Sequence, residues 1–288
     1  LLYACSGQIV FAGMTAYAMS AHLALNLLWL RAFLEHNRRG DGLALCLGFL
    51  ASGLHQLAFH PLFAAPILCL TLVRGELGRA AFFFVGYLLV AAFWIWWPQF
   101  ALAQAGGGAI APHSEPLEFF AREAAKVGPE AVTLFLLNVV RAITWQHVLL
   151  LPLFALGARA GLRGDPLVGA LVGASAMPFV MFSVVPAWQG VGWGYRYCHA
   201  ALGAAIIVGV YGWRSLRAEA AHAARIFAIG SLFTCLVILP FQALHISSYY
   251  RAAAKADRLI NSADADLAII DNMGAPFGVD LVGNAPDL

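Results

Sequence analysis

Long apolar segments separated by short polar stretches follow one another through most of the 288-residue chain. A helix needs about 20 apolar residues to cross the roughly 30 Å hydrocarbon core of a bilayer. The pattern therefore predicts membrane-spanning helices at about 8–30, 80–100, 131–157, 166–186, 197–213 and 226–246. The stretch 43–73 also lacks charged side chains, but its length is too great for one crossing and short for two.

Positive charges on either side of 43–73 resolve this ambiguity. Three arginines precede the stretch in 31–42, and two follow it in 74–79. Because short loops rich in arginine and lysine stay on the cytoplasmic side, both ends of the stretch belong on the same side. We therefore expect 43–73 to cross twice as a tight hairpin of two short helices. Its tip is predicted at Phe59-His60-Pro61, since proline disfavours helical geometry in the residue before it.

The remaining loops that carry arginine, 158–165 and 214–225, also fall on the cytoplasmic side when the predicted spans cross the membrane one after another. The predicted fold is an all-α polytopic membrane protein with about eight transmembrane helices in a domain spanning 1–246. Both ends of this multi-pass chain then lie outside the cytoplasm. The chain begins at Leu1, in apolar sequence and without a signal peptide, so we also expect it to be a fragment of a longer protein.

Two predicted outer segments differ in composition from the spans. Residues 101–130 contain a stretch with charged and apolar residues on opposite helical faces, which predicts a short amphipathic helix on the membrane surface. The tail 247–288 is acidic and carries a short apolar run at 267–270 between aspartates. We interpret this tail as an extracytoplasmic segment that begins a soluble α/β domain.

Composition supports a membrane protein and excludes several other classes. Hydrophobic residues make up 61% of the chain and charged residues only 11%, whereas a soluble domain carries about 25% charged residues. The formal net charge of +2 provides no broad basic face for nucleic acid. The five cysteines form no CxxC pair and are interpreted as small hydrophobic residues. The expected surroundings of the chain are therefore membrane lipid.

Arg141 is the only formal charge inside a predicted span, about 15 Å deep at 1.5 Å per residue. A charge at that depth is costly unless it faces protein or water. The functional interpretation is a cavity that binds an anionic group; the structural one is an arginine paired within the bundle or reaching an interface. His60 at the hairpin tip has the same two interpretations, as a residue lining a cavity mouth or as a structural cap.

The segment WQGVGWGYRYCHA, residues 188–200, is the densest group of candidate binding residues. Trp193, Tyr195 and Tyr197 suit an aromatic belt at the membrane interface. The same rings also stack on sugars, the glycines allow close approach of a ligand, and Arg196 can bind a phosphate in a bidentate manner. We therefore treat these four residues as candidate substrate contacts.

The distribution of carboxylates limits the chemistry. No Asp or Glu lies inside a predicted span, which argues against a proton or cation pump. Glu115 and Glu118 are weak candidates for a catalytic base, and a solvated loop is the favoured explanation for them. The chain contains no phosphate-binding loop, no dinucleotide fingerprint and no HExxH motif, and a need for a divalent metal is left open.

Three segments resemble bacterial membrane glycosyltransferases of the GT-C class, which are similar to dolichyl-phosphate-mannose protein mannosyltransferases. Residues 6–30, SGQIVFAGMTAYAMSAHLALNLLWL, resemble a helix of that class with a spaced Ser, Tyr and Leu. The hairpin at 42–68 resembles its paired short helices, although Phe59-His60-Pro61 stands where the class keeps Arg-Pro. The segment GWGYRY, residues 192–197, resembles an outer Gly-Trp-…-Arg-Tyr loop.

This resemblance implies an enzyme that takes a sugar from a polyprenyl-phosphate donor and transfers it on the extracytoplasmic face. It implies that Arg196 binds the donor phosphate, because only Arg196 matches a motif position of the class. The catalytic carboxylate of the class lies in an outer loop after its first helix, which this sequence does not contain.

Two further hypotheses come from other functional classes. A transporter or flippase for an amphipathic or anionic substrate would explain a buried arginine, but the chain has no internal repeat of the kind many transporters carry. A non-catalytic membrane subunit would use the acidic tail for docking. Removing an outer carboxylate distinguishes these hypotheses, because a transferase should lose its activity and a transporter should keep its own.

Overall fold

The computed structural model describes residues 1–14, 18–54, 57–105, 125, 127–185, 194–216 and 220–262. Within these residues the chain is helical and contains no strand, which confirms the all-α prediction. The chain divides into two units, Leu1–Leu232 and Phe233–Leu288.

Three helices in the described part are long and apolar enough to cross a membrane: Leu77–Gln104, Pro166–Val184 and Ala221–Ile260. Three shorter apolar helices are Met19–Leu34, Phe59–Val73 and Leu150–Gly161. These helices support a membrane protein, whereas eight crossings and their orientation stay predictions.

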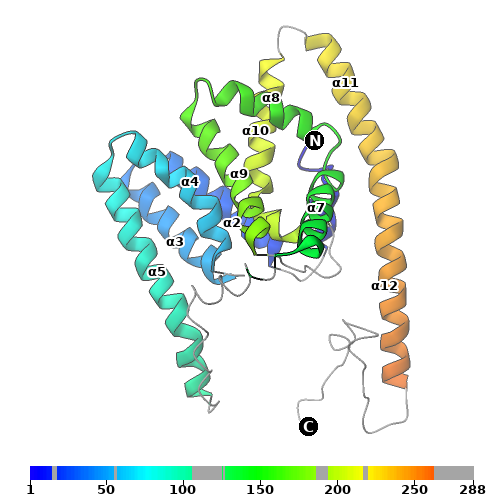
Figure 1. Cartoon of the computed structure of the whole chain (residues 1–288), viewed down its shortest axis with the longest axis horizontal. Helices are drawn as coiled ribbons and strands as arrows, with labels where there is room; N and C mark the ends of the chain where they lie inside the picture. Colours follow the sequence, from blue (N-terminus) through cyan, green and yellow to red (C-terminus); the bar gives the residue numbers. More distant parts are fainter. Residues whose placement is uncertain are drawn as a thin grey trace. The chain divides into compact units, whose positions relative to one another are not determined.

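The first unit contains most of the helices shown in Figure 1. They are α1 (Gly7–Ala12), α2 (Met19–Leu34), α3 (Arg38–Leu54), α4 (Phe59–Val73), α5 (Leu77–Gln104), α7 (Pro129–Thr144), α8 (Leu150–Gly161), α9 (Pro166–Val184), the 3-10 helix η1 (Arg196–Ala201), α10 (Leu202–Ser215) and α11 (Ala220–Phe233), whose last residue falls in the second unit. The second unit contains the π-helix η3 (Thr234–Ile238) and α12 (Leu239–Ser262).

The stretch 43–73 forms two helices, α3 and α4, as the flanking arginines predict. The predicted position of the turn is wrong, however, because α4 already begins at Phe59 and contains Pro61 in its first turn. Proline is tolerated there because the first backbone N–H groups of a helix have no partner within the helix. The connection between the helices therefore lies before Phe59.

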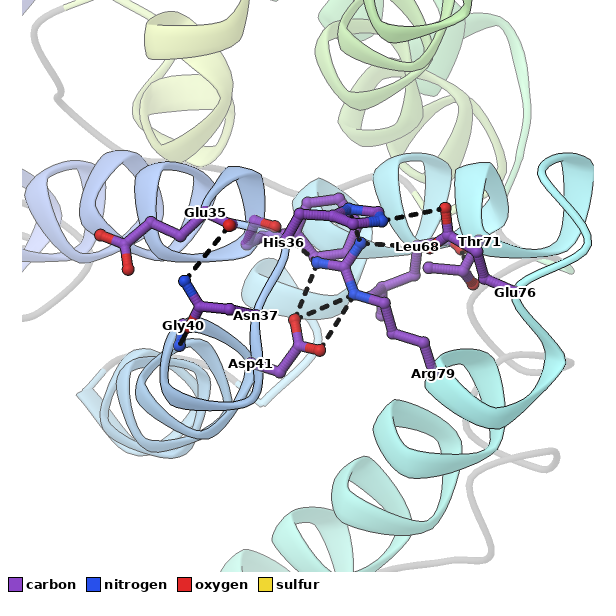
Figure 2. A network of polar contacts seen from close by, with 10 residues as sticks. Glu35, His36, Asn37, Gly40, Asp41, Leu68, Thr71, Glu76 and Arg79 are labelled. Atoms are coloured by element: carbon purple, nitrogen blue, oxygen red, sulfur yellow. Dashed lines mark hydrogen bonds and ion pairs between the residues drawn. The ribbon is translucent and has the colours of Figure 1, made fainter.

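Arg79 holds together the segments on either side of the hairpin (Figure 2). Its guanidinium donates hydrogen bonds to both carboxylate oxygens of Asp41 at 2.8–3.1 Å and to Glu76 at 3.2 Å. It also donates to His36 Nδ1 and to the carbonyl oxygen of Phe33, and it lies 4.1 Å from the Phe33 ring centroid. The loops 31–42 and 74–79 therefore meet at the same end of the hairpin.

Helix α5 has the features of a membrane span along its whole length. Arg79 stands in its first turn, and Trp94, Trp96 and Trp97 cluster near its other end with neighbouring phenylalanines. The 18 residues from Arg79 to Trp97 cover about 27 Å at 1.5 Å per residue, close to the roughly 30 Å of a hydrocarbon core. A charged end and an aromatic end at this spacing match two membrane interfaces.

The predicted single span at 131–157 is wrong, because the chain breaks between α7 and α8. The turn at 145–149 is fixed by its polar side chains: the Leu149 N–H donates to His147 Nδ1 at 3.1 Å, and Ser6 donates to Gln146 at 2.6 Å. His147 Nε2 lies 3.0 Å from the Ser231 hydroxyl. Arg141 consequently lies in the last turn of a helix and not in the middle of one.

Helices α8, α9 and α10 pack together, with α8 and α10 in the closest contact (Figure 1). Gly157 and Gly212 face each other at this contact. A Cβ atom on Gly157 would overlap the carbonyl oxygen of Val208, and one on Gly212 would overlap that of Leu153. The absence of side chains lets the two backbones touch, as small residues commonly do between helices in membranes.

Other predicted boundaries shift as well. The span 8–30 contains two helices, α1 and α2, and 197–213 contains η1 followed by α10. The helix predicted to end near 246 continues through Ser262, so the first part of the acidic tail is helical. The predicted amphipathic helix in 101–130 and the strand at 267–270 lie outside the described residues.

Candidate functional site

The segment after Gly194 is held in place by a single glutamine from the beginning of the chain. Gln8, in α1, accepts a hydrogen bond from the Tyr195 N–H at 3.2 Å and donates one to the Tyr195 carbonyl oxygen at 2.9 Å. Gly194 has a φ of +74°, in the left-handed region that favours glycine, and a Cβ atom there would overlap the Gln8 amide oxygen. The glycine therefore lets the chain approach Gln8 closely.

Gln8 is also joined to the break between α7 and α8. Gln146 donates from Nε2 to Gln8 Oε1 at 3.0 Å, and Ser6 donates from its hydroxyl to Gln146 Oε1 at 2.6 Å. The Ser6 hydroxyl also accepts from the Ile9 N–H at 3.2 Å and so caps α1. All three side chains are buried. We call Ser6, Gln8 and Gln146 the amide cluster.

The amide cluster borders an apolar groove with a volume of about 400 Å³, which we call the amide groove. Gln8 and Gln146 line it together with Ala142 and Ile143 of α7, and α8, α9 and α10 supply mostly apolar side chains. Cys198 of η1 completes the lining near the segment held by Gln8. A groove that is apolar along its walls and carries two amides fits one apolar chain with a polar end.

Arg196 and Tyr197 directly precede Cys198, a lining residue of this groove, on η1. Arg196 is half-buried, its guanidinium lies 5.2 Å from the Tyr197 ring centroid, and its Nη2 lies 3.4 Å from the Tyr197 hydroxyl. The Tyr197 ring stacks on Phe182 at 5.0 Å and on Phe59 at 5.9 Å between centroids. The sequence predicts both residues as substrate contacts, and the structure brings them together on one aromatic platform.

Tyr195, the third candidate of this segment, is almost fully buried between Phe179 and Phe182. Burial raises the pKa of its phenol well above the usual value, with smaller contributions from Cys198 and Tyr197. Its backbone is hydrogen-bonded to Gln8, and its ring packs edge-on against the ring of Tyr197. Its position therefore suits a support for the site better than a ligand contact.

Arg141 is half-buried and directly precedes two residues that line the amide groove, Ala142 and Ile143. Among the described residues, no carboxylate lies within ion-pair distance of its guanidinium. A positive charge in the last turn of a helix is stabilised by the helix dipole, which makes this position less costly than one in mid-helix. Arg141 remains placed to serve an anionic group at the edge of the groove.

His60 lies apart from the amide groove, in a hydrogen-bonded chain of its own. Asn26 donates to the Ala200 carbonyl oxygen at 3.2 Å, so its amide oxygen faces His60 Nδ1 at 2.7 Å. Nδ1 therefore carries the proton, and Nε2 accepts from the Tyr87 hydroxyl at 2.6 Å. His60 is fully buried and joins α2, α4 and α5. This arrangement corresponds to the structural interpretation of His60.

The other predicted site residues, Trp193, Glu115 and Glu118, lie outside the described residues. Within the described part of the chain, no group of three or more His, Cys, Asp or Glu side chains is placed to hold a metal ion. The sequence reasoning missed Ser6 and Gln8, although a polar pair inside an apolar segment was a signal that could have found them.

No family model, no curated protein and no solved structure matches the chain.

Proposed function

We propose that the chain is the membrane core of a glycosyltransferase that takes a sugar from a polyprenyl-phosphate donor and transfers it on the extracytoplasmic face of a bacterial inner membrane. The observation that supports the proposal is the amide groove, which has apolar walls and is lined by Cys198 of η1, the same short helix that carries Arg196 and Tyr197. The resemblance of GWGYRY to the outer loop of GT-C enzymes assigns the same arginine, Arg196, to the donor phosphate.

The parts of such a donor suit different parts of the site. The polyprenyl chain requires an apolar groove, which α7, α8, α9 and α10 supply. The phosphate requires cationic hydrogen-bond donors, and Arg196 provides a planar fork for it, with Arg141 at the groove edge as a second cation. The sugar requires polar and aromatic contacts, for which Tyr197 is suited, and the buried amides of Gln8 and Gln146 hold the segment that leads into η1.

The chemistry follows from the charge that develops during transfer. When the bond between the sugar and the phosphate breaks, negative charge grows on the departing polyprenyl phosphate. An arginine held beside that phosphate stabilises the transition state more than the ground state, and this difference lowers the barrier. A carboxylate must remove the proton from the acceptor hydroxyl, and Glu115 and Glu118 are the candidates within this chain.

Sugar transfer in membranes tests this proposal. Membranes that carry the chain are supplied with radiolabelled polyprenyl-phosphate sugars, and the labelled acceptor and the released lipid phosphate are measured. We expect transfer with the wild-type chain and its loss in Arg196→Ala. Arg163→Ala, which changes an exposed arginine after α8, is the matched control and should retain transfer.

Two results contradict the proposal. Movement of the intact lipid-linked sugar across the membrane without cleavage would indicate a flippase. Transfer by Arg196→Ala at the wild-type rate would remove Arg196 from the site.

A further inference from the structure

A second groove lies between α4 and α5, with a volume of about 570 Å³. Small side chains form much of it: Ala64 and Ala65 on α4, and Ala80, Ala81 and Ala91 on α5. The remaining lining is almost entirely apolar, and the Thr71 hydroxyl is already bonded to the Leu68 carbonyl oxygen at 2.7 Å. We call this the α4–α5 groove. Among its few polar lining residues, Thr71 and Tyr87 are already hydrogen-bonded, which leaves only the buried Ser52 hydroxyl for a polar ligand.

The α4–α5 groove is long enough to hold an acyl chain. Its lining extends along α5 from Leu77 to Ala91, which at 1.5 Å per residue is about 21 Å. One leaflet of a bilayer contributes about 15 Å to the hydrocarbon core. The groove is therefore longer than one leaflet is thick, so an acyl chain that enters at the Leu77 end can lie in the groove over its whole depth in that leaflet.

The Leu77 end of the groove carries a positive charge without an acidic partner. Arg74 is exposed and lies at the C-cap of α4, two residues after Leu72, which lines the groove. Among the described residues no carboxylate pairs with Arg74, whereas Arg79 is neutralised by Asp41 and Glu76. The mouth of the groove is therefore suited to an anionic head group.

We propose that the α4–α5 groove binds one acyl chain of an anionic phospholipid, whose phosphate lies beside Arg74. The bound lipid fills the space between α4 and α5, so it stabilises this pair of helices by binding to the folded state. This site is separate from the amide groove, and the proposal does not depend on sugar transfer. It assigns the occupant to a bilayer lipid and not to the glycosyl donor.

Native mass spectrometry of the full chain, released from detergent with added lipid, tests the proposal. Phosphatidylglycerol and phosphatidylcholine with identical acyl chains serve as the anionic and neutral probes. We expect one tightly retained phosphatidylglycerol, preferred over phosphatidylcholine by about fivefold, the effect of one basic residue near an anionic lipid. Arg74→Gln should remove that preference, and Arg39→Gln, the loss of another exposed arginine, should preserve it.

Filling the groove gives an independent test. Ala81→Phe puts a ring into the groove from an exposed position and should abolish retention of the lipid, whereas Ala92→Phe places the same ring outside the lining and should not. Equal retention by both variants would overturn the proposal. Displacement of phosphatidylglycerol by an equal amount of polyprenyl phosphate would also overturn it, because the groove would then belong to the donor lipid.

Discussion

Replacing Gln8 with leucine removes the side chain that holds α1, the α7–α8 break and the start of η1 together. Three buried groups then lose a partner at 3.2 Å or less, namely the Tyr195 N–H, the Tyr195 carbonyl oxygen and Nε2 of Gln146, and His199 loses a longer contact at 3.4 Å. An unpaired buried polar group costs about 1–3 kcal/mol. At about 1 kcal/mol for each of the three groups, the expected local destabilisation is about 3 kcal/mol.

The buried thiol of Cys198, three residues after Tyr195, reports this loss directly. Its alkylation requires the segment to open, so a destabilisation of about 3 kcal/mol should raise its rate by about 100-fold. The rate is measured by mass spectrometry of the chain in detergent, with the exposed Cys46 as an internal reference. Gln104→Leu, which changes an exposed glutamine at the end of α5, is the control and should leave the rate unchanged.

A rise in the Cys198 rate of less than about threefold in Gln8→Leu, which corresponds to less than about 0.7 kcal/mol, would refute this reasoning. It would mean that Gln8 does not hold the segment after Gly194. An equal rise in Gln104→Leu would also refute it, because the change would then reflect a general loosening of the chain.

Further substitutions test the packing around the site. Arg79→Met should lower the melting temperature, with a loss of about 2 kcal/mol, because Asp41 loses charge-assisted hydrogen bonds in a partly buried position. Gly157→Leu should destabilise the α8–α10 contact by at least about 3 kcal/mol, measured by thermal unfolding, and a stable variant would contradict the close backbone contact. Gly194→Ala should raise Cys198 alkylation as Gln8→Leu does, and an unchanged rate would contradict the close approach of this glycine to Gln8.

The hairpin of α3 and α4 was predictable because charge and hydropathy gave independent information about it. Hydropathy alone gave one apolar stretch, and the arginines on both sides required an even number of crossings. The contacts of Arg79 with Asp41 and His36 bring the two flanking segments together, which is compatible with that prediction. The predicted turn is misplaced because proline is tolerated in the first turn of a helix, which is where Pro61 lies in α4.

The break at 145–149 and the amide cluster could not be predicted from local sequence. Because apolar residues surround Gln146 and His147, the mean hydropathy over a window as long as a membrane span stays high and does not reveal these two polar residues. The break is held by hydrogen bonds between residues far apart in the sequence. Ser6 and Gln8 bond to Gln146 across about 140 residues, and Gln8 bonds to Tyr195 across 187. The candidate residues Arg196 and Tyr197 were identified by type, but their platform depends on Phe59 and Phe182 from other helices.

The central claim, that the amide groove and Arg196 hold a polyprenyl phosphate, is tested most directly by binding of that lipid to the purified chain. The measurement compares the dissociation constant of polyprenyl phosphate for the wild-type chain with those for Arg196→Gln and Arg163→Gln. The account predicts that Arg196→Gln weakens binding by about tenfold or more, the value of one charge-assisted hydrogen-bonded pair, and that Arg163→Gln does not. Equal dissociation constants for all three chains, or no binding by any of them, would contradict it.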